Sequence, residues 1–88
     1  MKIEKVNELI EYEFDRLKDI VLNKNIDYGN SLQNPIGTFS QTPMEGLYGR
    51  IDDKLGRIRS VGVTEDTIDT VDDLIGYLVH LRIMYNNK

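Results

Sequence analysis

The chain has 88 residues, which is enough for one domain, and its net charge of −4 argues against a protein that covers long stretches of nucleic acid. It contains no cysteine, so disulfide bonds and thiolate metal sites are excluded. The charged opening residues are not typical of a signal peptide, and no apolar run approaches the ~20 residues that a membrane span requires. We therefore expect a cytoplasmic protein with no membrane partner.

Apolar residues recur every three or four positions at the start of the chain, which predicts a helix over residues 3–24. This stripe consists of Ile3, Val6, Ile10, Phe14, Leu17 and Val21. At about 100° per residue, Glu13 and Lys24 also fall within it. Because an unpaired buried charge is costly, we expect Glu13 to be paired. Its partner would be Lys54 or an arginine in a core salt bridge, or else a cation that Glu13 orients toward a ligand.

Residues 25–43 contain both prolines and little periodicity, which predicts a long connection. Its first part, from Asn25 to Asn30, is rich in residues that favour turns. A connection of this length is unusual in a small domain unless it has a function.

A second helix is expected over residues 44–61, with Pro43 or Met44 at its start and Gly62 as its C-cap. Its core-facing positions are predicted to be Leu47, Ile51, Leu55 and Ile58. Arg50, Lys54 and Arg57 border this apolar stripe, and Lys54 lies almost within it. Three cations beside the core of an acidic protein indicate either interhelical salt bridges or a site for an anion. Asp53, one turn from each arginine, is expected to orient them.

Two glycines, Gly49 and Gly56, lie seven residues apart on one face of this second helix. Each costs roughly 1 kcal/mol of helix stability relative to alanine. The close approach of another backbone or a ligand would explain them, and simple tolerance of glycine would explain them equally well.

A third helix is expected over residues 64–86, with Thr64 as its N-cap and acidic residues in its first turn. Its broad apolar face contains Val71, Leu74, Ile75, Leu78, Leu81 and Tyr85. Three long helices of this kind cannot cover one another's apolar faces. The prediction is therefore an all-α fold, with a helical bundle that is completed by dimerisation or higher oligomerisation.

Acidic residues are spaced one turn apart on the opposite face of this third helix, at Glu65, Asp69 and Asp73, and Tyr77 continues the row. Carboxylates at this spacing can share Mg²⁺, a cation that prefers oxygen ligands. A solvated face, or ion pairs with Arg50 and Arg57, would produce the same pattern. His80 lies on this face with no partner in a metal motif, and we expect it to be a bystander.

Three clusters, Lys24–Ser31, Arg50–Ile58 and Glu65–Val79, together resemble the nucleotide modification associated domain 1 family, whose members are small helical proteins of bacteriophages and prophages. The family pattern is a lysine before D-Y-G, then R-x-x-D-K-x-x-R, then D-T-x-x-D-L-x-x-Y. Its first two parts correspond here to Lys24, Asp27, Tyr28 and Gly29, and then to Arg50, Asp53, Lys54 and Arg57. The last part corresponds to Asp69, Thr70, Asp73, Leu74 and Tyr77. The resemblance implies a link to phage nucleotide metabolism or base modification.

The last cluster also resembles the acidic helix of MazG-like nucleotide pyrophosphohydrolases, which hold Mg²⁺ with an E-x-x-E pair and an E-x-x-D pair. The nearest equivalents here are Glu8 with Glu11 and Asp69 with Asp72. The second pair begins with the shorter aspartate, and the first faces away from the apolar stripe of its helix. Both departures argue against a pyrophosphohydrolase of that type.

The leading hypothesis is a nucleotide-binding protein in which Arg50, Lys54 and Arg57 hold phosphate through charge-assisted hydrogen bonds. Tyr28 or Tyr77 would stack on a base, and Asp27 or Asp73 would recognise donors of the base or ribose. The first alternative is a Mg²⁺-dependent phosphohydrolase with Glu65, Asp69 and Asp73 around the metal. The second is a helical interaction module without a ligand.

Overall fold

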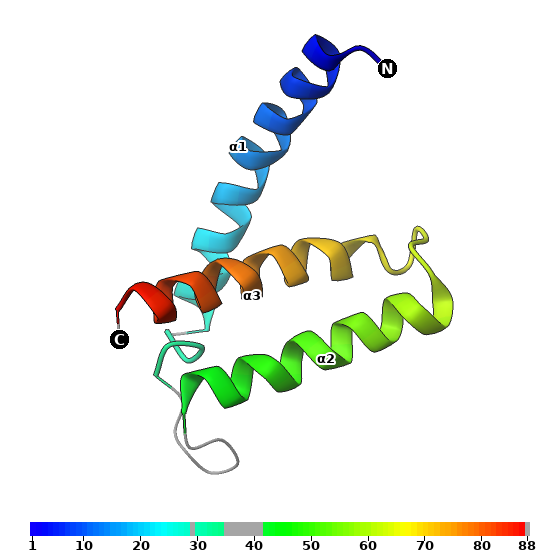
Figure 1. Cartoon of the computed structure of the whole chain (residues 1–88). Coiled ribbons are helices and arrows are strands. Elements are labelled where there is room, and N and C mark those ends of the chain that lie inside the picture. The colour runs from blue at the N-terminus through cyan, green and yellow to red at the C-terminus, as the bar shows by residue number, and fades with distance from the viewer. Residues whose placement is uncertain (29, 35–41, 88) are drawn as a thin grey trace.

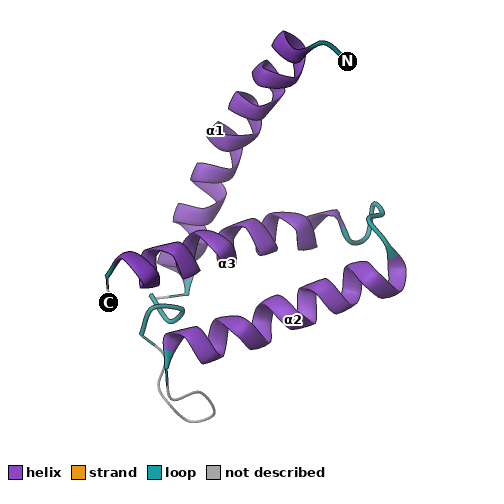
Figure 2. Ribbon diagram, in the orientation of Figure 1, coloured by secondary structure: helices purple, strands orange, loops and turns teal. Residues whose placement is uncertain are grey.

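Three helices and their connections make up the computed structural model, which describes residues 1–28, 30–34 and 42–87. The helices are α1 (Ile3–Asp27), α2 (Pro43–Val61) and α3 (Ile68–Asn86), and the described residues contain no strand. α2 and α3 form an antiparallel hairpin, and α1 crosses α3 with only its C-terminal half against the hairpin (Figures 1 and 2). The all-α prediction is confirmed.

The start of α2 follows from local chemistry. The Thr42 hydroxyl accepts a hydrogen bond from the backbone N–H of Glu45 at 3.2 Å, and Pro43 occupies the first turn, where its missing N–H costs nothing. At the other end, Gly62 adopts φ 82° and donates its backbone N–H to the Ile58 carbonyl at 2.7 Å. The predicted bounds of this helix and its glycine cap are confirmed.

The start of α3 differs from the prediction, because the helix begins at Ile68 and Thr67 takes the capping position in place of Thr64. The two threonines bind the connection instead. The Thr67 hydroxyl donates to the Gly62 carbonyl at 2.7 Å and accepts from the Thr64 N–H at 2.8 Å. Thr67 is only 4% exposed, so these bonds form a buried clasp between the ends of α2 and α3.

At its C-terminal end, α1 continues one turn beyond the predicted residue 24, to Asp27. Hydrogen-bonded turns follow over residues 30–34, with Asn30 in the left-handed region at φ 67°. Residues 35–41 of the predicted long connection, and Gly29 of the D-Y-G cluster, lie outside the described residues.

The core lies between the hairpin and the turn that follows α1. Its buried cluster is Leu32, Leu47 and Met84, with Met44, Tyr77 and Leu81 packed against it. Leu47 is 1% exposed, in agreement with its predicted core position, whereas Leu55, which was predicted to face the core, is 52% exposed. Ile51 and Ile58, one turn before and after it on α2, are half-buried, so Leu55 lies at the edge of the covered face of this helix.

The faces of α3 were assigned correctly only in part. Part of the predicted apolar face is covered, since Val71, Leu74, Ile75 and Leu81 are half-buried, whereas Leu78 and Tyr85 are exposed. The fully buried residues of this helix are His80, Thr70 and Met84. The reason is that α3 lies between two neighbours and uses its polar row as an inner face, which a single apolar stripe does not reveal.

The first half of α1 projects away from the rest of the molecule and is exposed over residues 3–14 (Figure 1). Of the predicted apolar stripe on this helix, Leu17 alone is buried among the described residues. As expected, the three helices of one chain leave an apolar face uncovered, and it is on α1. No described helix has the length and apolar character that crossing a membrane would require.

Candidate functional site

Three helices meet at the carboxylate of Asp73. Lys24 of α1 donates a hydrogen bond to its Oδ1, and the Lys54 ammonium of α2 lies 3.2 Å from its Oδ2. The Asp73 side chain is 18% exposed, and those of Lys54 and Lys24 are 23% and 41% exposed. One carboxylate therefore faces two ammonium groups in a partly desolvated position.

The charges around Asp73 shift the pKa values of this cluster. Burial acts to raise the pKa of Asp73, but the hydrogen bonds and positive charges of Lys24 and Lys54 outweigh it and hold that pKa below its ordinary value. The hydrogen bond to Asp73 raises the pKa of Lys24. The shifts of Asp73 and Lys24 favour their charged forms, and one carboxylate facing two ammonium groups gives the cluster one net positive charge.

A second ion pair fixes α1 against α3 on the far side of the cluster. Arg16 donates two parallel hydrogen bonds to Asp72, from Nη1 to Oδ2 and from Nη2 to Oδ1, each of 3.0 Å. Arg16 also binds Glu13 on its own helix, with Nη2 2.6 Å from Oε2. The one guanidinium of Arg16 is thus shared by the carboxylates of Asp72 and Glu13, and these three side chains carry one net negative charge beside the Asp73 cluster.

The predicted pairing of Glu13 is corrected in part by these contacts. Its partner is an arginine, which was one of the two predicted kinds of partner. The pair is half-exposed, however, and does not lie in the core. Lys54, the other option, binds Asp73 instead. The position of Glu13 explains this, since it lies in the exposed first half of α1, one turn before the buried Leu17.

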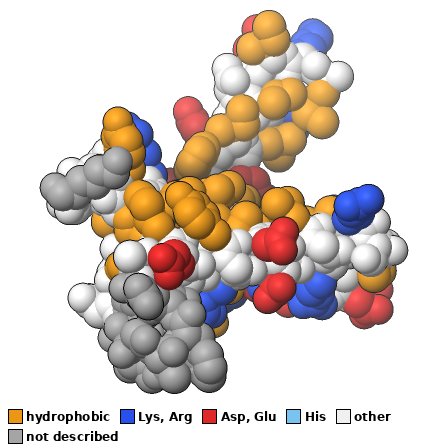
Figure 3. Space-filling view, turned by 60° about the horizontal axis from the view of Figure 1, so that its bottom comes forward, with side chains coloured by type: hydrophobic (Ala, Val, Ile, Leu, Met, Phe, Trp, Pro, Cys, Tyr) orange, Lys and Arg blue, Asp and Glu red, His pale blue; other side chains and the backbone are white. Residues whose placement is uncertain are grey.

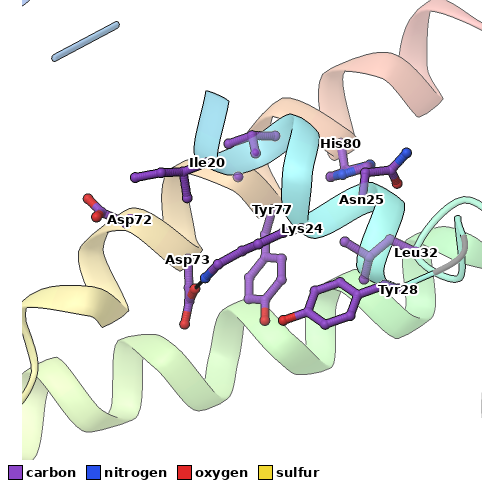
Figure 4. Close-up of a pocket in the computed structure, with 11 residues that line it drawn as sticks. Ile20, Lys24, Asn25, Tyr28, Leu32, Asp72, Asp73, Tyr77 and His80 are labelled. Atoms are coloured by element: carbon purple, nitrogen blue, oxygen red, sulfur yellow. Dashed lines mark hydrogen bonds and ion pairs between the residues drawn. The ribbon is translucent and has the colours of Figure 1, made fainter. Parts of the chain in front are cut away.

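A small pocket opens beside the cluster, between the last turns of α1 and the middle of α3 (Figure 4). Its polar lining residues are Lys24, Asn25, Tyr28, Asp72, Asp73, Tyr77 and His80, and its apolar floor includes Ile20, Val21 and Leu32. In Figure 4 the rings of Tyr28 and Tyr77 converge with their hydroxyl ends toward one another, close to Lys24. The cavity volume is ≈ 20 Å³, which is room for about one water molecule.

One acceptor in the pocket has no partner. Oδ1 of Asn25 is buried and receives no hydrogen bond from the described residues, although its amide nitrogen donates to Oδ1 of Asn30 at 2.8 Å. A buried acceptor without a donor costs free energy. A donor from outside the chain, such as water or a ligand, would satisfy it.

His80 forms the inner end of the pocket and is 5% exposed. Gln33 donates its amide nitrogen to His80 Nδ1 at 3.0 Å and to the His80 carbonyl at 3.2 Å. Because an amide nitrogen can only donate, Nδ1 is the acceptor and the ring proton resides on Nε2. Burial lowers the pKa of His80 and so favours this neutral ring.

The structure brings together five of the residues predicted for ligand binding, namely Lys24, Tyr28, Lys54, Asp73 and Tyr77. They come from all three sequence clusters. Arg50, Asp53, Arg57 and Asp27 are exposed, lie outside the pocket lining and have no ion pair with any described residue. The predicted orientation of the two arginines by Asp53 is therefore not present.

The three carboxylates predicted to share a metal are not gathered into one cluster. Within residues 1–28, 30–34 and 42–87, no group of three His, Asp or Glu side chains is placed to hold a metal ion. Glu65 lies in the turn before α3, Asp69 is exposed, and Asp73 is bound by the two lysines.

Sequence reasoning missed the roles of Arg16, Asn25, Gln33 and His80. Arg16 lies outside the matched clusters, and its bond to Asp72 spans 56 positions, so no local pattern indicates it. The burial of His80 had one available signal, because it lies seven residues from Asp73 and three from Tyr77, on the face for which a metal site, ion pairs and solvation were all considered.

Comparison with known proteins adds no relative: no family model matches the chain, and neither a curated protein nor a solved structure is significantly similar to it.

Proposed function

We propose that the protein binds a small phosphorylated ligand of the nucleotide class at the Asp73 cluster and its pocket. The observation that carries this proposal is the pair of ammonium groups, from Lys24 and Lys54, on a single carboxylate. One of the two positive charges is not compensated within the cluster. A phosphate would supply the missing negative charge through charge-assisted hydrogen bonds.

Other features of the pocket favour a nucleotide over inorganic phosphate. Two aromatic rings, those of Tyr28 and Tyr77, lie beside the cations, and such rings stack on bases. Oδ1 of Asn25 offers a buried acceptor, which a water molecule in the pocket would link to a donor of the ligand. The resemblance of the three clusters to a family associated with nucleotide modification supports the same class of ligand.

The size of the pocket limits how such a ligand would bind. Space for one water molecule does not admit a base, so the base would lie at the pocket mouth, against the half-exposed ring of Tyr28. The phosphate would then reach the lysines from the solvent side. Binding without catalysis, as in a carrier or a protein that sequesters nucleotides in a phage-infected bacterium, fits these residues best.

A thermal-shift screen with mono-, di-, tri- and cyclic nucleotides, with and without Mg²⁺, tests the proposal. A ligand at 100 times its Kd adds about 2.7 kcal/mol of stability, which is a shift of about 10 °C or more for a domain of this size. Absence of a shift with every nucleotide contradicts the proposal. Release of phosphate or pyrophosphate in the presence of Mg²⁺ would instead favour the phosphohydrolase.

Variants locate the site once a ligand is found. Lys24→Gln and Lys54→Gln are each expected to weaken binding about tenfold or more in calorimetry, whereas Lys18→Gln, an exposed lysine of α1, should leave Kd unchanged. The double variant Arg50→Gln/Arg57→Gln tests the hypothesis from the sequence, in which these two arginines hold the phosphate. If it abolishes binding while the lysine variants do not, the phosphate site is on the outer face of α2.

A further inference from the structure

The projecting half of α1 carries an apolar stripe that nothing in the chain covers. Ile3 is 76% exposed, Ile10 47% and Phe14 69%, and Val6 and Leu9 are exposed as well. Hydrophobic side chains line this part of the molecule and continue at its base (Figure 3). At 1.5 Å per residue, the uncovered segment from residue 3 to residue 14 is about 18 Å long.

A groove continues this stripe into the body of the protein. It lies between α1 and α3 and is lined by Leu9, Ile10, Phe14 and Leu17 of α1 and Ile75 of α3, with Glu13 at its edge. The stripe and groove together form one surface, which we call the α1 face. It is independent of the Asp73 cluster, whose pocket shares none of these residues.

The whole chain is less compact than a typical domain of its size. It exposes 6953 Å², whereas a compact protein of its mass exposes about 5,300 Å², an excess of about 1,600 Å². The radius of gyration is 14.8 Å, compared with about 12 Å for a compact domain of this length. The uncovered α1 face is part of this excess, and if half of the excess on each of two chains were buried, the total of about 1,600 Å² would equal a standard stable interface.

The stripe is also suited to a second copy of itself. It is symmetric about Ile10: Val6 and Phe14 lie four residues to either side, and Ile3 and Leu17 seven residues to either side. Two α1 helices that pack antiparallel around a twofold axis at Ile10 would match apolar with apolar residues along their length. Ile3 of one copy would then enter the groove at Leu17 and Ile75 of the other.

We propose that the protein is a twofold-symmetric dimer in which the α1 face of each copy is covered by the α1 helix of the other, antiparallel and centred on Ile10. Light scattering coupled to gel filtration should give about twice the chain mass of 10.2 kDa at micromolar concentration. A monomeric mass at about 100 μM overturns the proposal.

Substitutions test the surface and the axis. Ile10→Glu brings two carboxylates together on the axis and is expected to raise the dimer dissociation constant at least 100-fold. Leu22→Glu is the matched control, because Leu22 is an equally exposed apolar residue of α1, 54% exposed, that does not line the groove. A dimer that survives Ile10→Glu overturns the proposal, because the interface must then lie elsewhere.

A further measurement keeps the test decisive if Ile10→Glu does not fold, as circular dichroism would reveal. The chain has no cysteine, so Ile10→Cys with a short bismaleimide should form covalent dimers, and Leu22→Cys should not. Failure to cross-link at Ile10 contradicts the arrangement.

Discussion

Lys54 of α2 and Asp73 of α3 form an ion pair of 3.2 Å. It links two antiparallel helices that are joined in sequence by the short connection over residues 62–67. The same carboxylate also binds Lys24 of α1. One side chain thus ties all three helices together, and its removal leaves two ammonium groups facing each other.

The first prediction concerns Asp73→Asn, which removes the counter-charge of both lysines. The variant should lower the free energy of unfolding by about 2 kcal/mol, which lies between the losses typical of a surface ion pair and of a buried one. Denaturation by urea at pH 7 measures it. Asp52→Asn, at an exposed aspartate of α2, should change stability by less than about 0.5 kcal/mol.

Since the pKa of Asp73 is lowered in the folded state, its contribution is present above the ordinary carboxyl pKa and is lost as the pH falls below it. The variant should accordingly approach the wild type in stability near pH 3.

The second prediction concerns His80, whose pKa is lowered by burial. Below the ordinary pKa of 6.5, His80 binds a proton in the unfolded chain but stays neutral in the folded chain. The free energy of unfolding therefore falls as the pH is lowered. One such proton contributes at most about 1.4 kcal/mol per pH unit. Thermal denaturation between pH 7.5 and 5.5 should therefore show a decline for the wild type and a smaller one for His80→Phe. Equal slopes for both proteins would contradict the assignment.

The third prediction concerns Gly56 in the middle of α2. A Cβ at this position would have no atom within 4 Å, so the alternative of a closely approaching neighbour within the chain is wrong for this glycine. Gly56→Ala should stabilise the protein by about 1 kcal/mol through helix propensity. The melting temperature measures it, with an expected rise of about 4–8 °C. A decrease would reveal that a ligand or partner approaches this face of α2.

The fourth prediction concerns Gly62, which differs from Gly56 in its backbone. At φ 82° and ψ −174° it occupies a region open almost only to glycine, although a Cβ would have free space. Gly62→Ala should destabilise the protein by about 1–3 kcal/mol, most of it through backbone strain. The two alanine variants, measured by the same urea titration, should shift in opposite directions; a stabilising Gly62→Ala would exclude strain at the cap.

Local patterns were sufficient for the elements of the fold. Apolar spacing placed all three helices, and Thr42, Pro43 and Gly62 show why the bounds of α2 could be predicted closely. The start of α3 was missed because Thr64 and Thr67 are equivalent as capping residues in the sequence. Only their hydrogen bonds to the connection distinguish them in the structure.

The candidate site could be predicted only in part, because helix periodicity gives angles within one helix and not the direction of its neighbours. Lys24 falls within the apolar stripe of α1 and Lys54 almost within that of α2, both belong to the matched family pattern, and both do reach Asp73. Arg50 and Arg57 lie on the border of the same stripe, but α2 is rotated so that they face outward. Whether a border residue is inside or outside depends on where α1 crosses, which no local signal reports.

The small core gives the folding equilibrium a particular form. Four apolar side chains are buried among the described residues, Leu17, Leu32, Leu47 and Met84, and such a core contributes little stability to a domain of this size. If the α1 face is covered by a second chain, folding and association are linked, and the unfolding midpoint should rise with protein concentration. The amount of protein in the cell would then itself regulate how much of it is folded, and the variants above are to be compared at one fixed concentration.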